Sequence, residues 1–453
     1  MLSLRALRAG ALAIALVMTP AAAQAETLRQ ALESAYMNNP DLMSALLSVK
    51  SAAEDIALRK AGKLPTIGLN ADVGAGFAVT NGTSSVSHSY GLSLGYQQTL
   101  FDNFKTESQI EQARAAAELT SYALRNAEQN VLLSVVSAYM SVIRDTQLVK
   151  LREENVAFFQ AQVDSSDQRL RLGEGTKIDV SQAQTRLAAA IASYKSAIAS
   201  LQTSRASYQR WVGHKPADLS QDFRVNGLLP TSIDAAVASA EERHPAILSA
   251  RAAIRAAMAG SDAAKAAFGP TLNLIGSLCG IGCFGNNPDQ GGMTGSVGLQ
   301  LSIPLYAGGA LGASMRKANL EQIKSEVDAL SARDQVRESV ISAWSTLQNT
   351  TAQIESANSA VASGQLVVEG LIQERDVGQR TTLDVLNAQA EVISAREGLI
   401  TATSSKVIAS FALLAAAGRL NPGDLGLNVE VKSGDAYTAK VEDIWQELRS
   451  IDE

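Results

Sequence analysis

Residues of the same or similar type recur along this chain at a constant separation of 205 positions, as in Pro40 and Pro245 or Gly173 and Gly378. A period this long exceeds that of solenoid and propeller repeats, so it indicates duplication of a domain-sized unit. We therefore predict two structural copies that lie side by side in a pseudo-symmetric wall. The same shift relates Pro65 to Pro270, Phe101 to Tyr306, Tyr139 to Trp344, Thr176 to Thr381, Asp179 to Asp384, Gln184 to Gln389 and Gly213 to Gly418.

The first 25 residues have the pattern of a secretory signal peptide. Arg5 and Arg8 precede the apolar run 9–18, and an A-x-A sequence at 23–25 precedes Glu26. These are the charged, apolar and cleavage regions of a leader that is removed on export. We expect a mature chain that begins near Glu26 and leaves the cytoplasm.

Charge and hydropathy narrow the partners of the mature chain. The formal charge is −6, and subtracting Arg5 and Arg8 makes it −8, which is too acidic for a nucleic-acid binder. No run of about 18 uninterrupted apolar residues follows the leader, so we expect no transmembrane helix. Contact with a membrane would therefore have to be made by strands.

Two segments predict very long helices. The range 104–171 contains neither proline nor glycine, and its counterpart 309–376 contains few glycines. At 1.5 Å per residue, such a segment forms a helix roughly 100 Å long. The return helices 176–211 and 381–417 are half as long, and Pro40 and Pro245 each open another short helix. Short helices stacked end to end beside each long one predict a wall of four helical columns.

Four segments alternate between apolar and small polar residues. The alternation is clearest in 89–97 and 296–303 and looser in 67–79 and 272–278. One apolar face and one small polar face suit the lipid and lumen sides of a membrane barrel. A soluble hairpin packed on a helix is the alternative. The Gly-, Asn- and Ser-rich ranges 80–87 and 281–293 predict hairpin loops.

Four strands cannot close a barrel, and lipid does not tolerate open sheet edges. Two chains would supply eight strands, which leave too narrow an interior, whereas three would supply twelve. We therefore predict a trimer. The chain divides into signal peptide 1–25; repeat 1, 26–213, with β-hairpin 66–100, long helix 104–171 and return helix 176–211; equatorial linker 214–230; repeat 2, 231–418, with β-hairpin 271–304, long helix 309–376 and return helix 381–417; and C-terminal collar or tail 419–453.

The junctions between strands, long helices and return helices resemble those of the TolC family of outer-membrane efflux proteins. The resemblance rests on the sequences at 96–102, 299–308, 171–180 and 376–386 and extends over residues 26–420. It implies a mostly α fold with a membrane β-barrel, in which a homotrimeric 12-stranded barrel continues as a 12-helix periplasmic α-barrel. It also implies a passive exit duct for efflux or type I secretion, located in the outer membrane and extending into the periplasm. The implied partners are outer-membrane lipid, a periplasmic adaptor (membrane fusion protein) and an inner-membrane pump of the RND, MFS or ABC type.

The resemblance also implies a gate at the tips of the helical hairpins. Asp384 matches the family's aperture aspartate, Arg380 the arginine of the same tip, and Asp179 a residue that ties neighbouring helices together. Asn387 replaces a second aperture aspartate and Arg375 replaces a tyrosine of the inter-helix lock. We expect Arg375 and Arg380 to pair with Asp179 or Asp384 across helices, and a weaker negative field than two aspartates would make.

A purely structural interpretation of the tips remains open. Thr176 to Asp179 and Thr381 to Asp384 have the spacing of a capping box. Gly173 and Gly378 follow the long helices as chain-reversal glycines, at tips that face the adaptor in the family.

The sequence offers no support for catalysis, a cofactor or a metal site. His88, His214 and His244 lack partners at metal-ligand or triad spacing, and no nucleotide-binding or hydrolase motif is present. Cys279 and Cys283 lie in a predicted outer loop, as a small disulfide or as two free thiols. The competing hypothesis is a secreted structural coiled-coil protein, a filament or translocator component without channel activity. The alternating strands favour the duct, and the cargo stays open between drugs and secreted protein.

Overall fold

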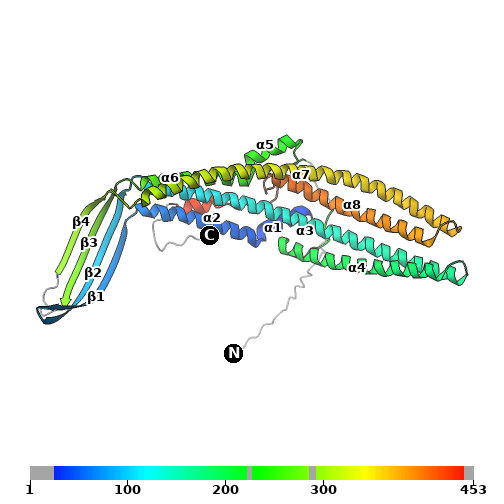
Figure 1. The fold of residues 1–453 in the computed structure, drawn as a ribbon, viewed down its shortest axis with the longest axis horizontal. Coiled ribbons are helices and arrows are strands. Elements are labelled where there is room, and N and C mark those ends of the chain that lie inside the picture. Colours follow the sequence, from blue (N-terminus) through cyan, green and yellow to red (C-terminus); the bar gives the residue numbers. More distant parts are fainter. Residues whose placement is uncertain (1–24, 222–226, 285–291, 443–453) are drawn as a thin grey trace, which may run out of the picture.

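The computed structural model describes residues 25–221, 227–284 and 292–442, without the side chains of 85, 87, 89 and 281–284. The signal-peptide prediction and parts of the linker, the second hairpin loop and the C-terminal tail lie outside these residues. Figure 1 shows an elongated rod of helices with a four-stranded sheet at one end. At the other end the chain reverses twice, from α3 into α4 and from α7 into α8. The elements are α1 (Leu28–Asn38), α2 (Pro40–Lys60), a 3₁₀ turn (Ala61–Lys63), β1 (Thr66–Thr80), β2 (Thr83–Phe101), α3 (Lys105–Arg171), α4 (Lys177–Val212), α5 (Ile233–Arg243), α6 (Pro245–Ala266), β3 (Thr271–Phe284), β4 (Gly292–Ser302), α7 (Ala310–Asp376), α8 (Thr382–Ala416) and α9 (Asp435–Val441).

Asparagine and histidine caps separate each pair of short helices. Asn39 and His244 both have extended backbones, as expected for a residue before proline, and Pro40 and Pro245 open α2 and α6. The Asn39 side chain accepts a hydrogen bond from the Asp41 backbone N–H, which satisfies a donor that the new helix leaves open. Residues at the junction itself therefore specify the kink between the two short helices in each half.

The sheet is fully antiparallel in the order β1-β2-β3-β4. Its register aligns Leu69 with Leu94 and Leu94 with Leu278, so that the apolar residues of neighbouring strands share one face. The predicted loop over 80–87 is wrong, because β1 and β2 are joined by Asn81 and Gly82 alone. Both residues have positive φ, 52° and 82°, as a two-residue type I′ turn requires.

The prediction that places the two cysteines in an outer loop is also wrong, because β3 continues to Phe284. Cys279 and Cys283 lie four residues apart on one strand, about 13 Å at the rise of a β-strand, whereas a disulfide needs Cα atoms within about 7 Å. The Cys279 thiol is free, and the Cys283 side chain lies outside the described residues. A disulfide between the two does not fit this strand.

The long helices α3 and α7 run the length of the rod, and the shorter helices lie alongside them (Figure 1). Next to the sheet, the contacts order the helices as α2, α3, α6 and α7; toward the far end the order is α4, α3, α8 and α7. The expected mostly helical fold with a strand pair in each half of the chain is present.

The main core lies midway along the rod, where α1, α3, α4 and α8 meet. Three tyrosines, Tyr36, Tyr139 and Tyr208, are fully buried there. The Tyr139 hydroxyl lies 2.7 Å from the backbone oxygen of Glu26, and Glu26 pairs as an isolated bridge with Leu219. This core therefore fastens the start of the described chain to the linker between the two halves.

One described helix is long and apolar enough to cross a membrane, which differs from the expectation drawn from the sequence. Its most apolar 18-residue window, within α8, has a mean hydropathy of 1.6 and is 44% buried inside the protein. The composition is rich in small residues that pack closely against α3 and α7. Core helices of packed proteins meet the same criteria of length and composition.

Candidate gate at the helical tips

Both long helices end in the same backbone turn. After α3, Gly173 has φ +78°, its N–H bonds to the Leu170 oxygen, and the Glu174 N–H bonds to the Arg169 oxygen. After α7, Gly378 has φ +79°. The N–H groups of Gly378 and of the residue after it make the equivalent bonds to α7 backbone oxygens. These are Schellman motifs, in which a left-handed residue closes the helix, and glycine adopts that conformation without strain.

Both return helices begin with a complete capping box. The Thr176 hydroxyl accepts from the Asp179 N–H at 3.2 Å, and the Asp179 carboxylate accepts from the Thr176 N–H at 2.9 Å. Thr381 and Asp384 repeat this at 3.2 and 3.0 Å. Both aspartates therefore cap helices, as the structural interpretation of the spacing predicts.

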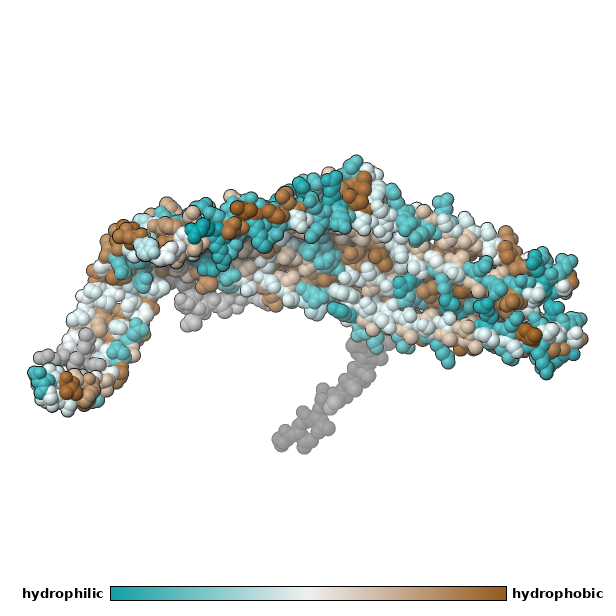
Figure 2. Space-filling model, in the orientation of Figure 1, coloured by the Kyte–Doolittle hydropathy of each residue, from teal (hydrophilic) through white to brown (hydrophobic). Residues whose placement is uncertain are grey.

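The surroundings of Asp384 also lower the pKa of its carboxyl group. Hydrogen bonds from the Thr381 hydroxyl and backbone, together with the nearby positive charge of Arg380, lower the pKa of this carboxyl below its usual range. The side chain is therefore held in its charged form at the very end of the rod. Figure 2 shows hydrophilic side chains gathered over this end.

The two tip arginines do not pair with Asp179 or Asp384, so that expectation is wrong within one chain. Arg375 is 7% exposed and turns toward α3, where it donates to the Gln162 side-chain oxygen at 2.6 Å. It also bonds to its neighbour Asp376 at 2.7 Å. Arg380 reaches back across its own turn to Glu374 at 2.9 Å. The sequence analysis missed Gln162, Glu374 and Asp376, because which side of a long helix faces its partner depends on tertiary packing.

Asn387 lies where the two helical hairpins meet. Its side-chain oxygen accepts a hydrogen bond from Arg186 of α4 at 2.9 Å. Arg186 was also missed, since nothing in its local pattern separates it from other exposed arginines. The bond from Arg186 to Asn387 joins α4 to α8, and the bond from Arg375 to Gln162 joins α7 to α3, so both are polar links between the hairpins.

An apolar contact joins the same two hairpins. Leu386 of α8 is fully buried against Phe159 of α3 and Ala190 of α4. Farther from the tips, Arg152 of α3 forms an ion pair with Glu397 of α8, whose pKa is raised by burial more than Arg152 lowers it. The seam between the hairpins thus alternates apolar and polar contacts.

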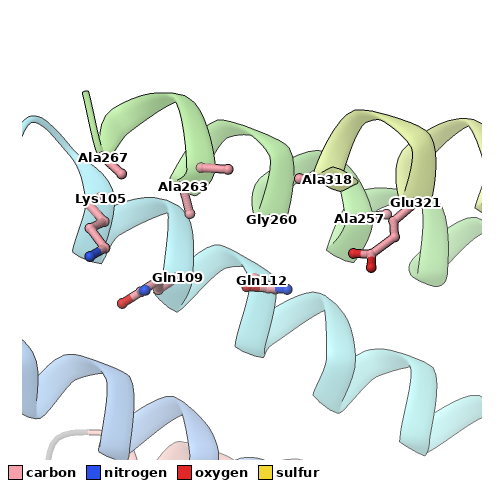
Figure 3. A pocket seen from close by; sticks show the side chains of 10 residues that line it. Lys105, Gln109, Gln112, Ala257, Gly260, Ala263, Ala267, Ala318 and Glu321 are labelled. Carbon is pink, nitrogen blue, oxygen red and sulfur yellow. The ribbon is translucent and has the colours of Figure 1, made fainter. Parts of the chain in front are cut away.

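Outside the tips, the described residues form a groove between helices and no cluster with metal-ligating chemistry. A groove of about 300 Å³ between α3, α6 and α7 is lined by small residues such as Gly260 and Ala318 and by Lys105, Gln112 and Glu321 (Figure 3). In the described part of the chain, no group of three or more His, Cys, Asp or Glu residues is placed to hold a metal ion.

The three histidines have separate structural settings. His88 lies in β2 opposite Ala75, and His214 lies 3.0 Å from the Glu26 carboxylate. His244 caps α6 through its Nδ1 atom, which accepts from the Ala246 N–H, and burial lowers the pKa of this imidazole. None of these positions brings the histidines together.

Comparison with known proteins identifies the family. Residues 28–214 and again 236–419 match the model of the outer membrane efflux protein family. The chain is 37% identical to outer membrane efflux protein BepC of Brucella suis over 96% of this chain and 95% of that protein. It is 26% identical to TolC of Escherichia coli K12, over 89% of this chain and 84% of TolC. It is 28% identical to the alkaline protease secretion protein AprF of Pseudomonas aeruginosa, over 87% of this chain and 84% of AprF.

Solved structures share the fold at lower identity. The CmeC outer membrane channel of Campylobacter jejuni has a TM-score of 0.77 and 16% identity, with 92% of this chain and 89% of that chain covered. VceC of Vibrio cholerae has a TM-score of 0.73 and 21% identity, with coverage of 86% and 96%. The family consists of export channels and not of enzymes, which favours an exit duct for efflux or secretion over the filament hypothesis. The chain belongs to the outer membrane efflux protein family, as a TolC-type protein that is located in the outer membrane and extends into the periplasm.

Proposed function

We propose that three copies of this chain form a passive duct through the outer membrane, held closed at rest by contacts between the helical hairpins. The observation that carries the proposal is that one chain supplies an open sheet. Strands β1 and β4 each pair on one side only. Unpaired backbone groups at a sheet edge are not tolerated in lipid, so the edges must be joined to those of other copies.

The sheet has the chemistry of a membrane wall. Val73 of β1 and Val297 of β4 are 90% and 83% exposed on the apolar face of a single chain. Each strand has at least 11 residues, and about 9–11 residues suffice to cross a membrane when the strand is tilted. The opposite face carries Gly, Ser, Thr and Asn, which suit a water-filled lumen.

The helical layer is open at the same two edges as the sheet. Edge helix α7 exposes Leu320, Ile323, Val327 and Leu330, each more than half exposed and spaced as in a coiled-coil seam. Figure 2 shows apolar side chains in a line along the upper edge of the rod, where α6 and α7 lie. The other edge helix, α2, exposes apolar side chains as well, Met43 and Leu47 among them.

One repeated interface would therefore join β4 and α7 of each copy to β1 and α2 of the next. Such a head-to-tail interface closes into a ring when the rotation fits. Three copies supply twelve strands and, at each level, twelve helices. A ring of this size has an interior that side chains do not fill, which a duct requires.

The closed state depends, in this proposal, on the links between hairpins. The hydrogen bond from Arg375 to Gln162 is buried and involves a charged group, and such bonds contribute about 1.5–3 kcal/mol to stability. Arg186 with Asn387 is exposed and contributes less. Opening moves the α7–α8 hairpin away from α3 and α4 and breaks both. Bonds of this size hold a gate closed and still yield to the binding energy of a partner.

The tip aspartate gives the closed end its charge. Three Asp384 side chains around a threefold axis would concentrate negative potential at the aperture, where cations are favoured. Asn387 adds a hydrogen-bond acceptor and no charge. The aperture of this chain would therefore attract multivalent cations less strongly than a family member with two aspartates.

The duct needs partners, because it is passive. A pump in the inner membrane, of the RND, MFS or ABC type, would supply the energy and choose the cargo, and a periplasmic adaptor would connect the two. The exposed turns around Gly173 and Gly378 are the surfaces we assign to that adaptor. The relatives include a protease secretion protein and the toluene efflux pump protein TtgC of Pseudomonas putida, so both cargo classes stay open.

Two measurements on the purified mature protein test this proposal. Light scattering in detergent should give a particle with the mass of three chains. A planar bilayer should then show discrete conductance steps, small in the parent protein. A monomer in detergent, or bilayers without steps at any voltage, would contradict the duct.

A further inference from the structure

The four strands contain a single acidic or basic residue. Asp72 is the only Asp, Glu, Lys or Arg in the ranges of β1, β2, β3 and β4. It stands near the middle of β1, seven positions into a 15-residue strand. A charge at the centre of a membrane strand is costly unless it faces water, so its placement identifies a functional position.

Asp72 lies on the small polar face of the sheet. Its chain neighbours Ala71 and Val73 lie on the apolar face, because successive residues of a strand alternate. Its cross-strand partner is Gly91 of β2, and the nearest same-face positions on its own strand are Asn70 and Gly74. In the proposed barrel this face is the wall of the lumen.

The carboxylate of Asp72 lies over Gly91. A Cβ atom at position 91 would lie 2.5 Å from Oδ1 of Asp72 and 2.9 Å from Oδ2, closer than real contacts allow. Glycine inside a strand weakens it and often marks a close approach of another group. Gly91 therefore leaves the space in which the acidic group lies against the sheet.

Nothing in the neighbouring strands neutralises this charge. Within one chain, β2 contributes no lysine or arginine, and its one histidine, His88, lies on the opposite, apolar face. In the proposed ring the other neighbour of β1 is β4 of the next copy, which also has no lysine or arginine. The charge would thus recur three times around the lumen with no counter-charge in the strands.

We infer that Asp72 is an ion-preference determinant of the barrel, which favours cations in the lumen independently of the charges at the helical tips. The inference rests on the proposed trimeric duct. A ring of like charges in a water-filled lumen bounded by a low-dielectric wall focuses its field and raises the local cation concentration. Cationic solutes would therefore pass this level more readily than anionic solutes of the same size.

The test compares ion preference in planar bilayers under a KCl gradient. All proteins carry Asp384→Asn, which removes the tip carboxylate. The first has no other change, the second adds Asp72→Asn, and the third combines Asp72→Asn with Asn70→Asp. The third variant moves the charge by one same-face position along β1 and keeps the net charge constant.

The reversal potential of the first protein should indicate cation preference. Asp72→Asn should shift it toward the value of a pore without preference, and the relocated aspartate should shift it back. Conducting pores with equal reversal potentials in all three proteins would overturn the inference and leave the duct intact. Failure of all three proteins and the parent to conduct would overturn the duct, and the inference with it.

Discussion

The guanidinium of Arg375 donates a 2.6 Å hydrogen bond to the side-chain oxygen of Gln162, 213 positions earlier in the chain. Both side chains are buried, at 7% and 8% exposure, although they lie close to the exposed end of the rod. The bond joins the end of α7 to α3, and therefore joins one hairpin to the other.

Replacing Gln162 by alanine should loosen the closed state. Arg375 would keep its charge but lose a buried acceptor, and leaving a buried polar group unsatisfied costs about 1–3 kcal/mol. Single-channel conductance should rise, or long openings should become frequent. Gln160→Ala is the matched control, because Gln160 is exposed and bonds within α3 to Asp164. Equal conductance in parent and Gln162→Ala would contradict a gate at this bond.

Removing Arg380 should have a much smaller effect than removing Arg375. Arg380 bonds to Glu374 within its own turn, and both side chains are about half exposed. Exposed ion pairs contribute about 0–1 kcal/mol. Arg375→Ala should therefore open the channel, whereas Arg380→Ala should leave conductance near the parental value. The reverse order of effects would indicate that Arg380 makes its important contact with another copy.

Replacing Asn387 by aspartate should strengthen cation block. The new carboxylate adds three negative charges to the proposed aperture and converts the Arg186 contact into an ion pair. Block by a trivalent cation such as hexaamminecobalt should then occur at lower concentration than in the parent. Asn358→Asp, an exposed position farther along α7, is the charge-matched control. Identical block in the parent and both variants would rule out an aperture at position 387.

Acid should weaken the contribution that His244 makes to the stability of the fold. The substitution His244→Asn should remove this pH dependence. The Nδ1 atom accepts from the Ala246 N–H and so must be unprotonated, and burial lowers the pKa of the imidazole below its usual 6.5. The unfolded chain binds the proton first, so this contribution is present above about pH 6.5 and is lost as pH falls through the lowered pKa. Asparagine is a good N-cap that does not titrate.

Thermal unfolding followed between pH 8 and pH 5 measures this difference. The loss of stability on acidification should be smaller in His244→Asn than in the parent. His88→Asn, at a strand position, serves as the control for removal of a histidine. A parent and a His244→Asn variant with parallel pH profiles would show that the cap does not titrate in this range.

Replacing Val327 by glutamate should prevent trimer formation. Val327 lies in the exposed apolar line of α7 and is 59% exposed in one chain. Each of three glutamates buried in the proposed interface would lose its hydration and gain no partner for its charge. Burying an unpaired charge is strongly unfavourable. Light scattering should detect smaller particles, whereas the neighbouring exposed change Glu326→Gln should leave the trimer intact. Trimers of unchanged stability in Val327→Glu would place the interface elsewhere.

The sequence by itself determined the elements wherever the deciding interaction is local. The absence of proline and glycine specified α3, and the Asn-Pro and His-Pro pairs specified the kinks before α2 and α6, since caps and proline act within a few residues. The alternation in 89–97 identified β2. The Asn81-Gly82 turn was readable for the same reason, and the longer predicted loop overlooked a dipeptide that favours a two-residue hairpin.

Only the tertiary structure decided which side chains meet between helices. An α-helix drifts by about 20° per heptad relative to a straight 3.5-residue repeat, so a small error in rotation accumulates along a helix as long as α3. For this reason the sequence placed Arg375 and Arg380 at the correct tip but paired them wrongly, and it did not find Gln162 or Arg186. Local chemistry specified the helices and strands, whereas the contacts that make a gate depend on the relative rotation of elements about 200 residues apart.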